Sequence, residues 1–497
     1  MPKRLRALLA AYLVVAAALL ALVALAAPPA GADGDPDRSD PTEAGEPDLE
    51  EYDAVAPDAA WRAAIRLTDV GENDDGAGVT VAVLDTGVTR HPDLDDRVAA
   101  RVDLTPDGDG IDRYGHGTHM AGVIAGGGDE SEERWTGAAP AASVLGVKVA
   151  GWNGATDVSV VLAGLEWIAA HRKRFGIRVV NLSYGTDSVQ DRLRDPLNRA
   201  VERLWRAGVL VVVGAGNRGD RAPAIEKPGD DPFVVTVGAA DTKGTEALAD
   251  DVVAPFSSRG PTAGGVAKPD LLAPGVSIVS HRAAGSTVDA LRPAARLGDR
   301  YFKGTGTSQA AAVVSGVAAR MFDANPALGP DEAKAALVGT ASGPLAGRPG
   351  AGAGLVDAAA AVRAARDGAF AGRAARQRLQ RSSGLGAVDA SRGTLRPYTD
   401  WRQPGVPELL QGEFDALGLV WDAEAWAARR WSAASWPLSR WARHTALAIG
   451  WGPASPADPW GGLGWDEGSW TAKSWGDAGL PSGDWVAKSW GAALWNG

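Results

Sequence analysis

Short apolar runs alternate with longer amphipathic runs along the middle of the chain. The amphipathic stretches include Asp157–Arg174 and Arg192–Ala207, which have the length and periodicity of helices. This alternation predicts an α/β three-layer sandwich, a mostly parallel sheet covered by helices on both faces. The apolar runs with the length of buried strands are Val79–Leu84, Val144–Val149, Val179–Leu182, Val209–Val213 and Val234–Val237.

The first 32 residues have a different pattern. Lys3, Arg4 and Arg6 precede a long uncharged apolar run, and Ala30-Gly31-Ala32 supplies a small-residue cleavage site. This order is typical of a secretory signal peptide and predicts a secreted or cell-surface protein. Because the apolar run is long for a signal peptide, an uncleaved membrane anchor is the alternative.

Composition divides the rest of the chain. We interpret residues 33–60 as an acidic, disordered arm, because Asp33–Asp58 holds eleven acids and one base and so accounts for most of the net charge of −11. We assign residues 61–366 to the α/β domain and residues 367–400 to a linker rich in Gly, Ala and Ser. Residues 401–497 form a Trp-rich repeat tail of low complexity.

Two features of the composition exclude whole classes of protein. The chain has no Cys, which rules out disulfides, a cysteine nucleophile and Cys-ligated zinc. Its acidic balance argues against nucleic-acid binding, which usually needs a basic surface.

Four short motifs carry candidate chemistry. Asp85 ends an apolar strand in VAVLDTGV, and His116 lies between glycines in YGHGTHMAG, before a helix of small residues. Ser308 opens a long helix in GTGTSQAAA, where unpaired N–H groups would stabilise an oxyanion. Asn217 follows a buried strand in VVVGAGN and offers a side-chain amide donor. Taken singly, these residues are also ordinary turn residues and helix caps.

His116 and His119 also form a His-x-x-His pair, which keeps a zinc hydrolase open as an alternative. No HExxH-type Glu accompanies the pair, so this alternative is the weaker one.

The chain order Asp, His, Asn, Ser resembles that of the subtilisin-like serine protease family, the subtilases. The resemblance covers roughly Trp61–Val362 and includes the supporting stretches NLSYG, FSSRGP and KPDLLAPG. It implies a secreted serine endopeptidase of subtilisin-like fold that acts on protein or peptide substrates through an acyl-enzyme. Ser308 would be the nucleophile, His116 the general base and Asp85 its partner. Asn217 and the Ser308 backbone N–H would form the oxyanion hole.

The resemblance also implies substrate-binding segments. The substrate backbone would pair with Ser183, Tyr184 and Gly185 and with the loop near Gly154. Gly214, Ala215 and Gly216 would floor the pocket for the side chain on the acyl side of the scissile bond, the P1 side chain, whose identity the sequence does not fix.

This chain departs from the family pattern at several points. Gln309 and Ala312 stand where family members commonly have Met and Pro, and no compact pro-domain is evident before the domain. The chemistry requires no cofactor. Structural calcium is common in the family, and the acidic loop Asp103–Asp112 offers oxygen ligands for it, although it lacks EF-hand spacing.

The Trp residues of the tail recur every five positions, as in Trp421, Trp426 and Trp431. This spacing matches neither a helix face nor a strand face, so a flat aromatic surface needs a bend within each unit. A poorly ordered tail is one interpretation. The others are binding to cell wall, glycan or a membrane surface, docking on the enzyme itself, or self-association.

A second hypothesis makes this tail the working part of an inactive binding protein built on a protease fold. The intact Asp, His and Ser motifs favour the protease.

Overall fold

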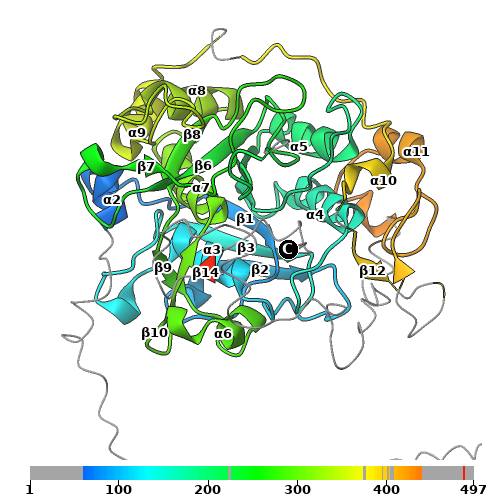
Figure 1. The fold of residues 1–497 in the computed structure, drawn as a ribbon, viewed down its shortest axis with the longest axis horizontal. Coiled ribbons are helices and arrows are strands. Elements are labelled where there is room, and N and C mark those ends of the chain that lie inside the picture. The colour runs from blue at the N-terminus through cyan, green and yellow to red at the C-terminus, as the bar shows by residue number, and fades with distance from the viewer. Residues whose placement is uncertain are drawn as a thin grey trace, which may run out of the picture. The chain divides into compact units, whose positions relative to one another are not determined.

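The five predicted strands lie side by side in one sheet (Figure 1). The computed structural model describes residues 60–221, 225–372, 376–394, 396–399, 402, 408–438, 441 and 485–486. The predicted strands correspond, within a few residues at each end, to β1 (Thr80–Asp85), β3 (Ser143–Lys148), β4 (Ile177–Leu182), β5 (Leu210–Gly214) and β6 (Val235–Asp241).

The sheet has the order β2-β3-β1-β4-β5-β6-β7, and β8 also pairs with β6. The additional strands are β2 (Val98–Asp103), β7 (Val252–Val253) and β8 (Leu271–Pro274). All pairs are parallel except β6–β7. The pattern of apolar runs did not reveal β2, because it lies at the sheet edge and its residues are only partly buried.

Helices cover both faces of this sheet. In β1, Leu84 packs against Gly164 of α4 (Val158–His171), whereas the next side chain, Asp85, contacts His116 of α3 (His116–Ala125). Successive side chains of a strand point to opposite faces, so α3 and α4 lie on opposite sides of the sheet. The long helix α7 (Thr307–Ala324) packs beside α3, and α5 (Pro196–Arg206) packs beside α4. The predicted α/β three-layer sandwich is confirmed.

A second, smaller sheet leads into α7. It contains β9 (Ile278–His281), β10 (Arg296–Leu297) and β11 (Tyr301–Thr305), and β9 and β11 run antiparallel. Two tail residues, β14 (Trp485–Val486), pair in parallel with Gly304 and Thr305 of β11. The remaining elements are α2 (Ala60–Ala64), α6 (Thr287–Leu291), α8 (Pro330–Thr340), α9 (Ala358–Asp367), α10 (Val388–Ser391), α11 (Ala423–Ala428), β12 (Tyr398–Thr399), β13 (Glu408–Leu409) and six short 3-10 turns at residues 67–69, 95–97, 129–131, 248–250, 293–295 and 436–438.

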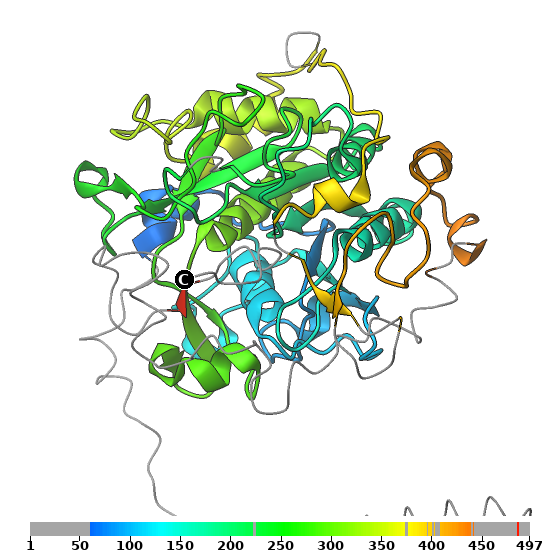
Figure 2. The same ribbon diagram turned by 45° about the vertical axis from the view of Figure 1, so that its right-hand side comes forward.

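The described residues from 381 to 438 lie on the α4 and α5 side of the domain, as both views show (Figures 1 and 2). Arg392, 1% exposed, forms an ion pair with Asp157, the N-cap of α4, in which Nε lies 2.6 Å from Oδ2. Ser382 N–H donates to both carboxylate oxygens of Glu202 on α5, at 2.9 and 3.0 Å. Part of the predicted linker is therefore fixed to the domain by buried charged groups.

The first Trp residues of the tail join the same surface. Trp421 and Trp426 are buried, with ring centroids 5.5 Å apart, and the Trp426 and Trp431 centroids are 5.8 Å apart. The Arg203 guanidinium of α5 lies over the Trp431 ring, 4.1 Å from its centroid. Trp426 lies in the short helix α11, whereas Trp421 and Trp431 lie outside it. No regular helix or strand runs from one Trp to the next, so residues five apart can bring their rings together. Trp421, Trp426 and Trp431 therefore pack against the α/β domain.

The predicted signal peptide and nearly all of the predicted acidic arm lie outside the described residues, as does most of the Trp tail. Among the residues that are described, no helix is both long enough and apolar enough to span a membrane. The domain limits drawn from composition stay a prediction.

Candidate active site

Asp85 and His116 form a buried pair at the carboxyl edge of the sheet. Asp85 ends β1, and His116 is the first residue of α3. His116 Nδ1 lies 2.8 Å from Asp85 Oδ1 and 2.9 Å from Oδ2, and both side chains are 0% exposed. A carboxylate in this position holds the imidazole in one tautomer, with the proton on Nδ1, and so orients Nε2 as a base.

Glycine makes this close packing of β1 and α3 possible. A Cβ on Gly117 would lie 2.2 Å from the Gly87 carbonyl oxygen and 3.1 Å from the Asp85 Cβ. Any larger residue would push His116 away from Asp85. The glycines that flank His116 in the sequence therefore have a steric purpose.

Asp112 organises the start of α3, whereas the sequence analysis considered it only as the last residue of the acidic loop offered for calcium. Its Oδ1 accepts hydrogen bonds from Gly115 N–H at 2.7 Å and Thr86 Oγ1 at 2.8 Å, and its Oδ2 accepts from Thr118 N–H at 2.8 Å. Burial raises the pKa of Asp112, and the N–H donors oppose that rise. Asp112 lies four residues before α3, in a turn where its side chain accepts the Tyr114 N–H at 3.2 Å. An Asp in a turn before a Gly is a turn signal that could have identified this residue.

His119 has a different partner from His116. Its Nε2 lies 3.0 Å from the Phe302 carbonyl oxygen, and burial lowers its pKa to about 3. His119 is thus a neutral histidine bonded to the backbone of β11, and the His116 and His119 side chains turn to different elements. This arrangement does not fit a shared zinc ion.

Asn217 is bonded to Thr307, the residue before Ser308 at the start of α7. Ser308 is the second residue of this helix, which packs against α3. Asn217 Oδ1 accepts hydrogen bonds from Thr307 N–H at 2.8 Å and from Thr307 Oγ1 at 2.9 Å. These bonds fix the side-chain amide, with its oxygen turned to Thr307 and its NH₂ group on the other side of the amide carbon.

The predicted substrate segments follow two neighbouring strands. Ser183 and Tyr184 come directly after β4 and are buried, and Gly214 ends β5. Gly216 N–H donates to Thr307 Oγ1 at 3.2 Å, which ties this segment to the helix of Ser308. Parallel β1, β4 and β5 are adjacent, so the structure brings Asp85, Ser183–Gly185 and Gly214–Asn217 to one edge of the sheet.

Glu226 lies beside Gly185 and Gly216 at this edge of the sheet, and the sequence analysis did not identify it. It is 2% exposed. A Cβ on Gly185 would lie 2.5 Å from Glu226 Oε2, and a Cβ on Gly216 would lie 2.9 Å from its Cδ. Glu226 N–H donates to the Ala215 carbonyl at 3.3 Å. The carboxylate therefore lies against both the segment that the resemblance assigns to the substrate backbone and the segment that it assigns to the P1 pocket.

Gln309, which stands where family members commonly have Met, does not contact the Asp85–His116 pair in any bond given for the described residues. A Cβ on Gly304 would lie 2.7 Å from Gln309 Nε2 and 2.9 Å from His119 Cε1. The Gln309 side chain thus packs between β11 and α3. Ala312 is buried within α7.

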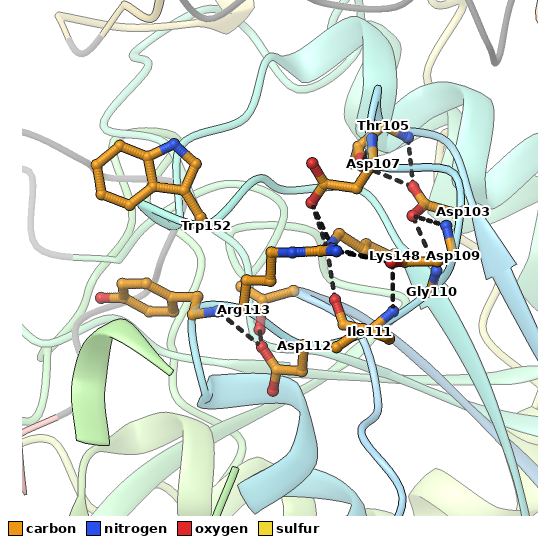
Figure 3. A network of polar contacts seen from close by, with 12 residues as sticks. Asp103, Thr105, Asp107, Asp109, Gly110, Ile111, Asp112, Arg113, Lys148 and Trp152 are labelled. Carbon is orange, nitrogen blue, oxygen red and sulfur yellow. Dashed lines mark hydrogen bonds and ion pairs between the residues drawn. The ribbon is translucent and has the colours of Figure 1, made fainter. Parts of the chain in front are cut away.

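The acidic loop proposed for calcium is already filled by the protein's own groups (Figure 3). The buried Lys148 ammonium donates to Asp107 Oδ2 at 2.7 Å and to the Ile111 carbonyl at 2.5 Å. Asp109 forms two bonds with the Arg113 guanidinium, at 2.9 and 2.7 Å. Asp103 accepts N–H bonds from Thr105, Asp109 and Gly110. Because its carboxylates are engaged in this way, the loop does not fit a calcium site.

Comparison with known proteins identifies the class. The subtilase family model matches residues 76–386, which is more than half of the chain. The chain belongs to the subtilase family, and the resemblance drawn from its motifs is confirmed.

Individual relatives agree with the family assignment. Serine protease AprX of Bacillus subtilis (strain 168) is 42% identical over 54% of this chain and 62% of its own length. M-protease of Shouchella clausii (strain KSM-K16) is 35% identical over 54% of this chain and 60% of its own length. Subtilisin Savinase of Lederbergia lenta is 36% identical over 50% of this chain and 78% of that protein. The chain thus spans about three fifths of the length of the first two relatives.

Among solved structures, a cold-adapted subtilisin-like serine proteinase matches 54% of this chain and 84% of its own chain, at 31% identity and a TM-score of 0.42.

Proposed function

We propose that this protein is a serine endopeptidase that cleaves protein or peptide substrates through Asp85, His116 and Ser308. The observation that carries the proposal is the buried Asp85–His116 pair at the start of α3, beside the helix that Ser308 opens. Membership of the subtilase family and the names of its relatives support it.

The reaction proceeds in two steps. His116 Nε2 takes the proton from Ser308 Oγ as the oxygen attacks the substrate carbonyl, and then gives that proton to the leaving amine. The acyl group stays on Ser308 until water, activated by the same imidazole, releases the acid product. The ionised Asp85 stabilises the imidazolium that forms in each step.

Negative charge develops on the carbonyl oxygen during the attack. The Asn217 side-chain NH₂ and the Ser308 backbone N–H donate to that oxygen in our proposal. The two hydrogen bonds from Thr307 hold the Asn217 amide in place before the substrate arrives. Such preorganisation gives oxyanion donors their effect, because no reorientation is needed in the transition state.

The position of Glu226 leads us to propose a preference for a basic P1 side chain. Ser183–Gly185 and Gly214–Gly216 line the P1 pocket in this proposal, and the Glu226 carboxylate contacts a glycine of each. A buried carboxylate favours an Arg or Lys side chain and repels an acidic one.

Turnover of peptides that differ only at P1 tests both proposals. We expect Arg and Lys substrates to exceed the matched Leu substrate in kcat/KM, and Glu226→Gln to lower that ratio about tenfold or more. Glu202→Gln, at a buried Glu of α5, is the matched control and leaves the ratio unchanged. Ser308→Ala abolishes turnover of every substrate.

The two proposals fail in different ways. Turnover that survives Ser308→Ala contradicts the serine mechanism. Normal turnover with no basic preference contradicts only the role of Glu226.

We also propose that the enzyme acts outside the cell, on the evidence of the basic and apolar N-terminal residues and the cleavage site before Asp33. Sequencing of the mature N-terminus tests this, with Asp33 as the expected first residue.

A further inference from the structure

Asp112, the last residue of the acidic loop, is a buried carboxylate that the proposed reaction does not use (Figure 3). Its side chain is 3% exposed, and no basic side chain of the described residues pairs with it. Burying a charge without an opposite charge costs free energy, so such a group has to be stabilised by hydrogen-bond donors. The identity of these donors shows what the carboxylate holds in place.

Five hydrogen bonds end on the two oxygens of Asp112. Its Oδ1 accepts from Gly115 N–H at 2.7 Å, from Tyr114 N–H at 3.2 Å and from Thr86 Oγ1 at 2.8 Å. Its Oδ2 accepts from Thr118 N–H and Thr118 Oγ1, both at 2.8 Å. An ionised carboxylate accepts on both oxygens, whereas a protonated acid or an amide would turn a donor toward one of these groups. This set of partners therefore favours the charged form.

The donors flank both members of the Asp85–His116 pair. Thr86 directly follows the aspartate of the pair at the end of β1, and Gly115 directly precedes its histidine at the start of α3. The Thr86 hydroxyl in turn accepts the Gly117 N–H at 2.9 Å. The buried carboxylate is therefore tied to the residue after the aspartate and, directly or through Thr86, to both neighbours of the histidine.

The Thr86 hydroxyl lies within reach of two carboxylates and has one proton to donate. Its oxygen is 2.8 Å from Asp112 Oδ1 and 3.2 Å from Asp85 Oδ1, so the shorter bond to Asp112 takes the proton. Asp85 Oδ1 keeps the Thr86 backbone N–H, at 2.7 Å, and His116 Nδ1, at 2.8 Å. Without the charge on Asp112, the hydroxyl is free to turn to Asp85, where it competes with the imidazole for the same oxygen.

We propose that Asp112 is a positioning residue of the catalytic centre, which acts through Thr86 and the neighbours of His116 to keep the imidazole aligned on Asp85. This inference rests on the proposed function, because the alignment matters only if His116 acts as the base. A shift of about 1 Å in a catalytic group can cost about 10²-fold in rate. The loss should fall on kcat, because none of the five side-chain bonds of Asp112 involves Ser183–Gly185 or Gly214–Gly216.

Steady-state kinetics of Asp112→Asn on a peptide substrate tests the proposal. The amide has nearly the same shape as the carboxylate, but its NH₂ group faces the donors of Gly115 or Thr118. We expect kcat to fall about 10–100-fold and KM to change by less than about threefold. Asp109→Asn is the matched control, because Asp109 belongs to the same loop but is exposed and bonded to Arg113. This control should leave both constants unchanged.

Two variants of Thr86 separate positioning from folding. Thr86→Val keeps the branched shape but removes the hydroxyl, and so breaks the link between Asp112 and Gly117. We expect it to lower kcat about tenfold or more. Thr86→Ser restores the hydroxyl and should recover most of the kcat of the parent.

The proton between His116 and Asp85 supplies a spectroscopic readout that general destabilisation does not move. This proton resonates far downfield in proton NMR spectra, and its position reports the strength of the hydrogen bond. In the folded Ser308→Ala chain, we expect Asp112→Asn and Thr86→Val each to shift the resonance upfield or abolish it. Asp109→Asn should leave it in place.

A kcat equal to that of the parent in either Asp112→Asn or Thr86→Val would overturn the proposal. A loss that falls on KM instead of kcat, an unmoved resonance, or equal losses in Thr86→Val and Thr86→Ser would also overturn it. If Asp112→Asn fails to fold by circular dichroism, the two Thr86 variants decide the question. Turnover that survives Ser308→Ala contradicts the proposed function itself, whereas turnover that Ser308→Ala abolishes but these variants leave intact contradicts this inference alone.

Discussion

Two buried pairs of carboxylate and imidazole lie in the described part of this molecule, and they differ in the distance between the ring nitrogen and the carboxylate oxygen. In one pair, His116 Nδ1 bonds to both oxygens of Asp85, at 2.8 and 2.9 Å. In the other, His281 Nε2 remains 3.6 Å from Asp93 Oδ2, and His91 stacks on the same ring. The first geometry fixes the orientation and tautomer of the His116 ring, whereas in the second the two rings stack face to face and His281 Nε2 stays 3.6 Å from the carboxylate. Residue type alone therefore does not decide what a buried Asp–His pair does.

After Ser308→Ala, the largest loss of activity should come from Asp85→Asn. An amide at this position favours the wrong tautomer of His116, so we expect kcat to fall about 10⁴-fold with little change in the fold. Steady-state kinetics on a peptide substrate, with circular dichroism as the check on folding, measures this. A loss of less than about tenfold would contradict the role given to Asp85.

Asn217→Leu removes the proposed side-chain donor to the oxyanion. We expect kcat to fall about 10²–10³-fold while KM changes little, because the bond forms only in the transition state. A variant that raises KM at constant kcat would show that Asn217 binds the ground state instead.

Asp93→Asn is the counterpart of Asp85→Asn in the second pair. We expect kcat/KM to stay within about threefold of the parent, while the free energy of unfolding drops by about 1–3 kcal/mol through the weakened bonds to Glu130 and Tyr301. Urea unfolding of the two variants in the Ser308→Ala chain makes the comparison direct. Equal loss of activity in both variants would remove the distinction between the pairs.

His119→Gln should have the smallest effect, visible only in the pH dependence of stability. The folded state keeps His119 neutral down to about pH 3, whereas the unfolded chain takes up that proton near pH 6.5. Protonation below pH 6.5 therefore favours unfolding, and stability falls as the pH drops from about 6.5 towards 3. We expect the Gln variant to show a shallower fall in urea unfolding between pH 7 and 4; an unchanged slope would contradict this reading.

The sequence predicted the parts of the site that adjoin a recognisable element. Asp85 ends an apolar strand, and His116 and Ser308 begin helices of small residues, so the motif and its structural context coincide. The predicted strands β1, β3, β4, β5 and β6 were correct for the same reason, because full burial leaves a continuous apolar run.

The parts that could not be predicted depend on segments far apart in the chain. Glu226 meets Gly185 and Gly216 only after folding, and His281 meets Asp93 across nearly two hundred residues. The Lys148 ammonium group binds Asp107 of the acidic loop, although Lys148 belongs to β3 and not to the loop itself. Arg392 likewise comes from a stretch whose composition is typical of a linker, and its burial arises from its pairing with Asp157.

The most direct test of the central claim is covalent labelling of the full chain with a serine-directed phosphonyl fluoride, followed by intact-mass and peptide mass spectrometry. We predict one adduct per chain on Ser308 with complete loss of activity, much slower labelling in His116→Ala, and no labelling in Ser308→Ala. An active enzyme that resists the reagent, or that carries the adduct on another residue, would contradict the account.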